Sequence, residues 1–236
     1  MPHQLRWRIL LHILIVMHKK EAALELLLSS KLLPLYYHDS AEVSLKILES
    51  LYAGGVRILE YTNRGENALT NFKHLKNAIK KTMPGLMLGI GTIKNKEQAK
   101  QFIKAGADFI VCPSINEEVG KVVSDAKLLW IPGCMTATEI AVAENSGATL
   151  VKIFPGNILG PPYISSIKDI FPKMKFMPTG GVEAEEENLK KWFESGVVAV
   201  GMGSKMISKE LINQKNYAEI EKSVKNALTL IKKCSV

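Results

Sequence analysis

Residues 149–156 read TLVKIFPG, and the organisation expected for the rest of the chain follows from this stretch. Apart from Lys152, residues 150–154 are apolar, β-branched or aromatic, and Pro155-Gly156 closes them, which is typical of a buried strand. A lysine enclosed in such a strand loses hydration, which favours the neutral amine, the form that acts as a nucleophile. The alternative is a lysine at a sheet edge, whose stem packs while its ammonium group reaches water.

The strand around Lys152 belongs to a regular alternation of strands and helices that runs from residue 18 to the end of the chain. Strands are expected at 32–37, 56–62, 86–92, 108–113, 128–133, 150–154, 175–181 and 197–203. Helices are expected at 21–30, 42–53, 66–81, 95–105, 116–127, 136–146, 161–170, 185–195 and 210–233. Strands separated by helices pair in parallel through right-handed crossovers. Eight such units predict a single-domain (β/α)8 TIM barrel with an extra N-terminal helix.

An open doubly wound sheet is the alternative fold. It is less well supported, because no G-x-G-x-x-G fingerprint follows the first expected strand.

The composition argues against several kinds of site. The 236 residues with 47% hydrophobic content suit one large α/β domain or two small ones, and no linker divides the chain after residue 18. Cys112, Cys134 and Cys234 form no C-x-x-C pair, and no two histidines stand at metal-ligand spacing. We therefore expect no disulfide scaffold, no metal and no cofactor, and the cysteine usage favours a reducing, cytoplasmic compartment.

The formal net charge of +8 does not by itself indicate nucleic acid. Glutamates lie between the lysines along the expected helices, and no basic run is interleaved with aromatic residues. The charge is better explained as a solvated surface that attracts small anions.

Residues 1–17 differ from the rest of the chain. Arg6-Trp7-Arg8 precedes an apolar run at 9–16, which resembles the charged and apolar regions of a signal peptide. No small-x-small cleavage site follows, and the run is too short to span a bilayer. Because Met17 stands directly after it, we interpret 1–17 as an extension outside the fold and 18–236 as the barrel domain. A weak membrane-surface anchor is the alternative, but no membrane partner is expected.

Polar residues stand where the expected strands end, which is where a barrel of this type carries its site. In the second strand, a period of two places Glu60 and Thr62 on one face, opposite Leu59 and Tyr61. A carboxylate among apolar neighbours is costly unless it is paired, and an adjacent lysine would stabilise it. This pattern predicts that Glu60 and Lys152 converge.

Two glycine-rich turns follow the seventh and eighth expected strands. They read Pro178-Thr179-Gly180-Gly181 and Gly201-Met202-Gly203-Ser204. Glycines let backbone N–H groups approach an anion, and the loops after these two strands form the usual phosphate site of a barrel. Helix-entry turns are the alternative interpretation.

With these stretches in place, the chain resembles the 2-keto-3-deoxy-6-phosphogluconate (KDPG) and 2-keto-4-hydroxyglutarate (KHG) aldolases. The matching stretches run through nearly the whole chain after residue 20, in the order and spacing of the family. They are AGGVRILEYTNR (53–64), GIGT (89–92), AGADFIVCP (105–113), PGCMTATE (132–139), VKIFP (151–155), PTGGV (178–182) and GMGS (201–204).

The resemblance implies a class I lyase on a (β/α)8 barrel that forms a homotrimer. It implies that Lys152 forms a Schiff base with the substrate and that Glu60 is the acid/base. Further residues are implied to bind the substrate, with the glycines and the serine at its phosphate: Arg64, Thr92, Pro113, Thr179, Gly180, Gly181, Gly203 and Ser204. The chain departs from the family pattern at three places: Tyr37-His38 where many members have arginine, Gly65 where some have threonine, and Gly156-Asn157.

The expected reaction is cleavage of a 2-keto acid to pyruvate and an aldehyde, either glyceraldehyde 3-phosphate from KDPG or glyoxylate from KHG. Two other classes stay open at this point. A phosphate-binding barrel isomerase or epimerase would need the anion site but no reactive lysine. A non-catalytic trimeric scaffold would need neither Glu60 nor Lys152.

Overall fold

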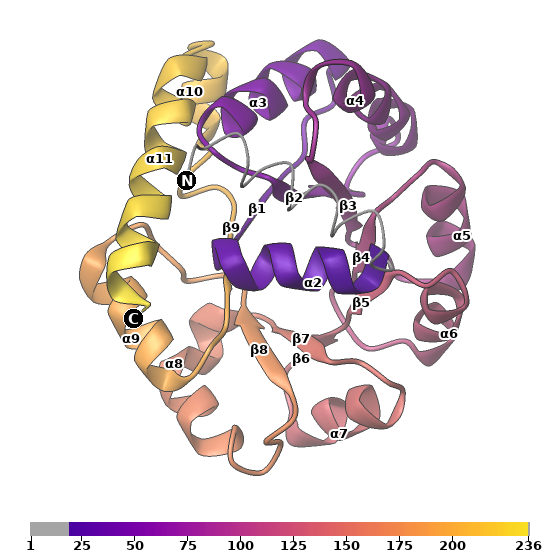
Figure 1. Cartoon of the computed structure of the whole chain (residues 1–236), viewed down its shortest axis with the longest axis vertical. Helices are drawn as coiled ribbons and strands as arrows, with labels where there is room; N and C mark the ends of the chain where they lie inside the picture. Colours follow the sequence, from indigo (N-terminus) through magenta and orange to yellow (C-terminus); the bar gives the residue numbers. More distant parts are fainter. Residues whose placement is uncertain (1–18, 236) are drawn as a thin grey trace, which may run out of the picture.

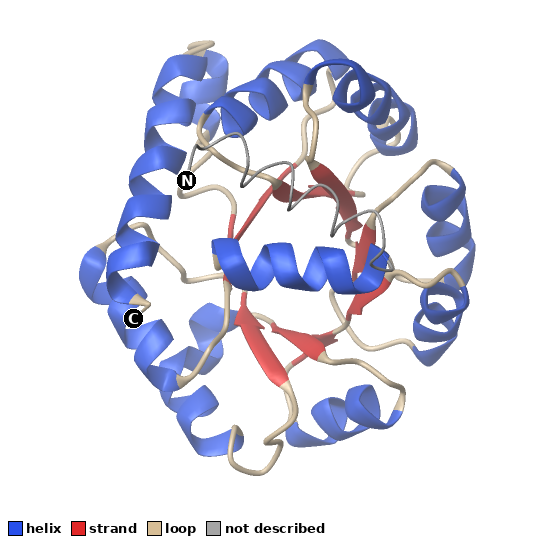
Figure 2. Ribbon diagram, in the orientation of Figure 1, coloured by secondary structure: helices blue, strands red, loops and turns tan. Residues whose placement is uncertain are grey.

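The computed structural model describes residues 19–235, so the expected extension at 1–17 lies outside the described residues. Figures 1 and 2 show parallel strands arranged in a ring, with helices packed around the outside. The fold is therefore an α/β fold built on a curled parallel sheet, the arrangement that alternating strands and helices produce when each crossover has the same hand.

The strands form two hydrogen-bonded sheets in which every pairing is parallel. The larger sheet has the order β5-β4-β3-β2-β1-β9, and the smaller has the order β6-β7-β8. The strands are β1 (Leu32–Tyr36), β2 (Ile58–Thr62), β3 (Met87–Gly91), β4 (Phe109–Val111), β5 (Leu129–Ile131), β6 (Gly133–Cys134), β7 (Leu150–Ile153), β8 (Lys175–Pro178) and β9 (Val200–Met202).

The helices lie between successive strands, apart from α2, which precedes β1, and the pair that closes the chain. They are α2 (Lys19–Ser30), α3 (Ala41–Ala53), α4 (Ala68–Thr82), α5 (Lys96–Lys104), α6 (Glu117–Asp125), α7 (Ala137–Asn145), α8 (Gly156–Ile167), α9 (Glu186–Ser195), α10 (Lys209–Asn213) and α11 (Tyr217–Cys234). Several begin at a side-chain cap; Ser40, Asn95, Asn116 and Thr136 each accept a hydrogen bond from the first turn of the helix that follows.

The expected count of eight strands is wrong, because the described residues contain nine strand segments. The expected strand at 128–133 is divided into β5 and β6 at Pro132, which has no N–H to donate to a ladder. The carbonyl of Pro132 still accepts a hydrogen bond from the Lys152 N–H, at 2.8 Å. At the other junction, the Val198 N–H donates to the Phe176 carbonyl at 3.0 Å, and Thr179 pairs with Gly201 in an isolated parallel bridge.

Two expected helices also differ from those in the structure. The single helix expected at 210–233 is two helices, α10 and α11, because Lys215 has a left-handed φ of 52° and Asn216 caps a new helix. The helix expected at 161–170 begins earlier, at Gly156, and is kinked at Gly160, whose φ of 70° is not helical.

The side chains that point into the ring form an apolar layer at the amino ends of the strands. This layer contains Leu33, Ile58, Phe109, Leu129 and Leu150, together with Ala23 and Leu27 of α2. Figure 1 shows α2 lying across the ring, so the helix covers that end. Because strand side chains alternate in direction, the next inward position of β2 is Glu60 and that of β7 is Lys152. The polar groups therefore lie above the apolar layer, toward the carboxyl ends of the strands.

Candidate active site

Glu60 and Lys152 face each other inside the ring. Lys152 Nζ lies 3.9 Å from Glu60 Oε1. Lys152 is only 4% exposed and Glu60 only 1%, so the ion pair is held in a medium of low polarity. None of the described residues donates a hydrogen bond to either carboxylate oxygen of Glu60. The carboxylate is thus close to the amine and still able to accept a proton from another group.

The environment of Glu60 raises its pKa above the ordinary value of 4.5. Burial is the main cause, and the positive charges of Lys152 and Arg64 partly oppose it. The space for this side chain comes from Gly91 on the neighbouring strand β3. A Cβ atom on residue 91 would overlap the Glu60 carboxylate, so only glycine leaves room for it.

Lys152 has an aromatic ring near its amine and a glycine as its neighbour in the sheet. The Phe154 ring lies 5.1 Å from Nζ, measured to the ring centroid. Gly133 is the register partner of Lys152 on β6. Cys112, which follows β4, is another potential nucleophile, but burial raises the pKa of its thiol to about 12. The thiol is therefore neutral at physiological pH, and Lys152 is the better candidate nucleophile.

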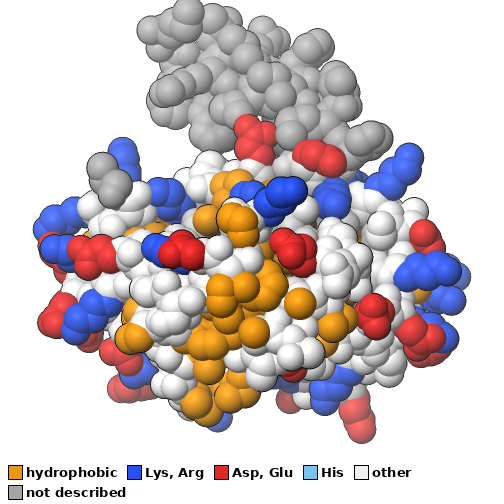
Figure 3. Space-filling view, turned by 90° about the horizontal axis from the view of Figure 1, so that it is seen from below, with side chains coloured by type: hydrophobic (Ala, Val, Ile, Leu, Met, Phe, Trp, Pro, Cys, Tyr) orange, Lys and Arg blue, Asp and Glu red, His pale blue; other side chains and the backbone are white. Residues whose placement is uncertain are grey.

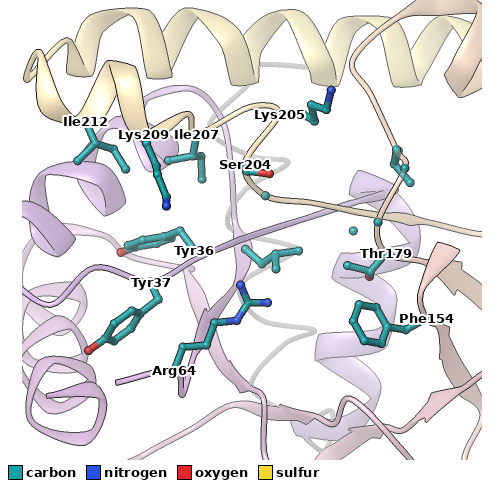
Figure 4. A pocket seen from close by; sticks show the side chains of 16 residues that line it. Tyr36, Tyr37, Arg64, Phe154, Thr179, Ser204, Lys205, Ile207, Lys209 and Ile212 are labelled. Carbon is teal, nitrogen blue, oxygen red and sulfur yellow. The ribbon is translucent and has the colours of Figure 1, made fainter. Parts of the chain in front are cut away.

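A cavity of about 360 Å³ opens next to this pair, on the side of the carboxyl ends of the strands. Six of the predicted site residues line it: Arg64, Thr179, Gly180, Gly181, Gly203 and Ser204. Figure 4 shows the Arg64 guanidinium and the Thr179 side chain directed into this space. Lys152 and Glu60 do not line the cavity. Phe154 does line it, and the same ring lies close to the Lys152 amine.

Thr92 and Pro113 do not line the cavity, and they follow the carboxyl ends of β3 and β4. Thr92 follows Gly91 and has a φ of 61°, a left-handed conformation that is unusual for a β-branched residue. Pro113 follows Cys112, and a Cβ atom on Gly133 would overlap its carbonyl group. Six of the predicted binding residues thus line the cavity, whereas Thr92 and Pro113 stand at strand ends outside its lining.

The turn after β8 depends on its two glycines. Gly180 and Gly181 have φ values of 90° and 71°, which favour glycine at both positions. A Cβ atom on Gly181 would also stand within 3 Å of the backbone of Asn157, at the start of α8. The turn therefore packs directly on the helix that follows the Lys152 strand. Thr179 Oγ1 is buried and has no hydrogen-bond partner among the described residues, so it can bind a ligand.

Sequence reasoning missed the aromatic wall of the cavity. Tyr36, Tyr37 and Phe154 line it, and Tyr37 donates a hydrogen bond to Asp39. A Cβ atom on Gly65 would overlap the Tyr37 hydroxyl, which explains why a larger residue is absent there. Tyr37-His38 and Gly65 are two of the three places where the sequence departs from the family pattern. Their joint departure was the feature of the sequence that could have indicated this wall. Lys209, Ile207 and Ile212 of the α10 region also line the cavity, and no sequence motif marked them.

Residues 19–235 contain neither a candidate metal site nor a candidate membrane span. No group of three or more His, Cys, Asp and Glu side chains is placed to hold a metal ion. None of the helices in this range is both long and apolar enough to cross a bilayer.

Comparison with known proteins relates this geometry to one family. The sequence model described as KDPG and KHG aldolase matches residues 24–223. The chain is 30% identical, over 84% of its own length and 88% of the relative's, to the 2-dehydro-3-deoxy-phosphogluconate aldolase of Pseudomonas aeruginosa. It is 28% identical to the KHG/KDPG aldolase of Escherichia coli, over 89% of this chain and 96% of that one.

A solved structure agrees with the sequence comparisons. The KDPG aldolase of Legionella pneumophila, captured with pyruvate as a covalent carbinolamine intermediate, superposes with a TM-score of 0.78 at 27% identity. The alignment covers 86% of this chain and 96% of that one. The family model, the sequence relatives and the fold agree, and the chain belongs to the KDPG and KHG aldolase family.

Proposed function

We propose that the protein is a class I aldolase that cleaves KDPG, KHG or both to pyruvate and an aldehyde through a Schiff base on Lys152. The observation that carries this proposal is the 3.9 Å approach of the Lys152 amine to the Glu60 carboxylate in the interior of the ring. A buried amine beside a buried proton carrier is the arrangement that imine chemistry requires. The names of the relatives support the choice of substrate.

The first half of the reaction forms the imine. Transfer of a proton from the Lys152 ammonium to the Glu60 carboxylate gives a neutral amine, which attacks C2 of the keto acid and forms a carbinolamine. Glu60 then donates a proton to the departing hydroxyl, water leaves, and a protonated imine remains. The raised pKa of Glu60 suits this step, because a carboxyl group that titrates nearer to neutral pH can both donate and accept a proton.

The second half breaks the C3–C4 bond. Glu60, directly or through water, removes the proton of the C4 hydroxyl, and the electrons of the breaking bond move into the imine. The aldehyde leaves and an enamine remains on Lys152. Protonation of the enamine at C3, followed by hydrolysis of the imine, releases pyruvate and restores the amine.

The cavity residues bind the two ends of the substrate. Arg64 holds the carboxylate, because its planar fork matches that planar anion, and Thr92 and Pro113 border the reacting carbons. The turns after β8 and β9 hold the phosphate through Gly180, Gly181, Gly203 and Ser204, with Thr179 beside them. Both ends lie in one cavity lined by Arg64 on one side and these turns on the other, which supports the assignment.

We also propose that the two sheets are parts of one closed (β/α)8 barrel in a single domain at 18–236, with α2 as its extra helix. The hydrogen bond from Val198 to Phe176 and the Thr179–Gly201 bridge support closure at one junction, and the covalent β5–β6 continuity supports it at the other. Residues 1–17 are then an extension outside the domain. If so, deleting 1–16 changes neither the melting temperature nor the turnover, and a clear fall in either contradicts this domain assignment.

A homotrimer in the cytoplasm is the proposed form of the protein. Figure 3 shows apolar side chains gathered on the side of the molecule that carries α7 and α8, and the large exposed apolar residues include Met135 and Ile158. A patch of this kind on a folded domain supports contact with a second copy of the chain. Light scattering of the purified protein should give three times the 26.1 kDa mass of the chain.

The proposed activity is tested by incubating the protein with pyruvate and borohydride. Only a protein that forms an imine becomes covalently labelled, so labelling separates the aldolase from an isomerase or epimerase that uses the same anion site. Release of pyruvate from KDPG or KHG then separates the enzyme from a non-catalytic scaffold. The absence of both borohydride labelling and pyruvate release would contradict the proposed function.

A further inference from the structure

Two lysines follow β9, and the structure gives them different surroundings. Lys205 forms an ion pair with Glu183 at 2.6 Å, and Figure 4 shows its amine turned away from the cavity. Lys209, the first residue of α10, makes no ion pair or side-chain hydrogen bond with any described residue. Figure 4 shows its side chain extending from α10 into the cavity. The two side chains are alike in charge and close in sequence, but only Lys209 presents its amine to a ligand.

The cavity is positively charged, because its described lining contains Arg64 and the two lysines but no Asp or Glu. With Lys205 paired to Glu183, the cations available to a ligand are Arg64 and Lys209, which approach from different sides of the cavity in Figure 4. Tyr37, where the family resemblance suggests an arginine, contributes no charge at the end of β1. A molecule with two separated anionic groups therefore matches this cavity.

The chemistry of the two ends differs. Arg64 offers a planar fork that suits a carboxylate, whereas a lysine acts as a point charge that suits a tetrahedral phosphate. The Ser204 hydroxyl and the glycine turns line the same cavity as Lys209, so further hydrogen-bond donors are available to the same anion. Ile207 and Ile212 line the cavity beside Lys209, and apolar neighbours strengthen an electrostatic contact by excluding water.

From these contacts we infer that Lys209 is a specificity-determining residue that holds the terminal phosphate of the substrate and so selects phosphorylated 2-keto acids. The inference rests on the proposed aldolase function and adds to it a substrate class. A five-carbon dicarboxylate such as KHG carries its second anion directly on C4 of the cleaved bond, as a planar group, whereas the phosphate of KDPG is attached two carbons farther away, at C6. KDPG carries a dianion at its far end, so it gains more from a second cation in the cavity than a dicarboxylate does. The aldehyde product is then a phosphorylated one.

The test compares Lys209→Met with a matched control, Lys205→Met, in steady-state cleavage of KDPG and KHG. Loss of one charged contact to the phosphate should raise the KM for KDPG about 10- to 100-fold in Lys209→Met. For KHG, kcat/KM should change less than about three-fold, and Lys209→Arg should restore most of the KDPG affinity. Lys205→Met removes the same charge from the same loop and should leave both substrates almost unaffected.

A second measurement separates failure of this inference from failure of the aldolase function. Pyruvate has no distal anion, so borohydride trapping of pyruvate should be equal in Lys209→Met and in the wild-type protein. No trapping in the wild-type protein would refute the aldolase function itself. With trapping intact, three results would overturn the role of Lys209: an unchanged KM for KDPG, an equal loss for KDPG and KHG, or an equal loss in Lys205→Met.

Discussion

Gly91 on β3 leaves the space that the Glu60 carboxylate on β2 occupies. The two strands pair in parallel, and a Cβ atom on residue 91 would overlap the end of the Glu60 side chain. Gly91 has no left-handed φ, so its backbone conformation does not require glycine. Glycine is required at this position to leave space for the Glu60 carboxylate. The position of the proposed proton carrier thus depends on an absent methyl group in the neighbouring strand.

Gly91→Ala should therefore displace Glu60 and reduce turnover while the protein stays folded. Overpacking of this kind typically destabilises a protein by about 1–3 kcal/mol. Gly89→Ala is the matched control, because residue 89 lies two positions earlier on β3 and its Cβ atom would meet the Phe109 ring. Thermal unfolding and turnover of both variants should show similar losses of stability but a much larger loss of turnover in Gly91→Ala. Equal turnover in the two variants would mean that the placement of Glu60 is not critical.

Glu60→Gln tests the proton carrier directly. Glutamine keeps the size of the side chain but cannot carry a proton, and general acid–base catalysis typically contributes about 10²–10⁴-fold. Turnover should fall within that range, while the pyruvate imine should still form slowly and be trapped by borohydride. Turnover at the wild-type rate would assign the proton transfers to another group.

The pH dependence of kcat/KM should reflect the raised pKa of Glu60. Burial favours the protonated carboxyl, so the acidic limb of the profile should have its midpoint above 4.5, the ordinary carboxyl value. The charge of Arg64 lowers this pKa, so Arg64→Met should move the midpoint to still higher pH as well as weaken substrate binding. A midpoint that stays in place in Arg64→Met would show that the limb belongs to a different group.

Substitution of Thr92 should affect the stability of the fold and the catalytic rate differently. Its left-handed backbone costs about 1–2 kcal/mol for a residue with a side chain, and glycine avoids this cost at some loss of chain entropy. Thr92→Gly should leave the free energy of unfolding unchanged or raise it by up to about 1 kcal/mol, yet reduce kcat/KM if the proposed position of Thr92 beside the reacting carbons is correct. Lys127→Gly, at a left-handed position between α6 and β5, should show the same stability effect with normal kinetics. Normal kinetics in Thr92→Gly would remove Thr92 from the site.

The approach of Glu60 to Lys152 could be predicted because it follows from short-range patterns. Alternation along each strand sets which side chains point inward, and parallel strands bring their carboxyl ends to one side. The two glycine turns could be predicted for the same reason, since their positions relative to the strands are fixed by the alternation. The catalytic and binding roles given to these residues stay predictions.

What the sequence did not reveal depends on contacts between segments far apart. The position of the Glu60 carboxylate over Gly91 depends on the β2–β3 register. The direction of the Lys209 side chain depends on the geometry of the loop after β9. The break between α10 and α11 was missed because the apolar period continues across it, although Asn216 followed by Glu219 is a helix-start signal. The interruption at Pro132 was not predicted, because the apolar run at 128–133 continues through the proline. The missing N–H of Pro132 was the signal in the sequence for this break.

The central claim is that Lys152 forms the imine, and peptide mass spectrometry after borohydride reduction in the presence of pyruvate tests it most directly. We expect a reduced pyruvate adduct on the peptide that contains Lys152, and none in Lys152→Met, which should fold because methionine fills a similar volume. Lys152→Arg should also lack the adduct and the activity, because arginine stays protonated. An adduct on another lysine, or substantial cleavage of KDPG or KHG by Lys152→Met, would contradict the account.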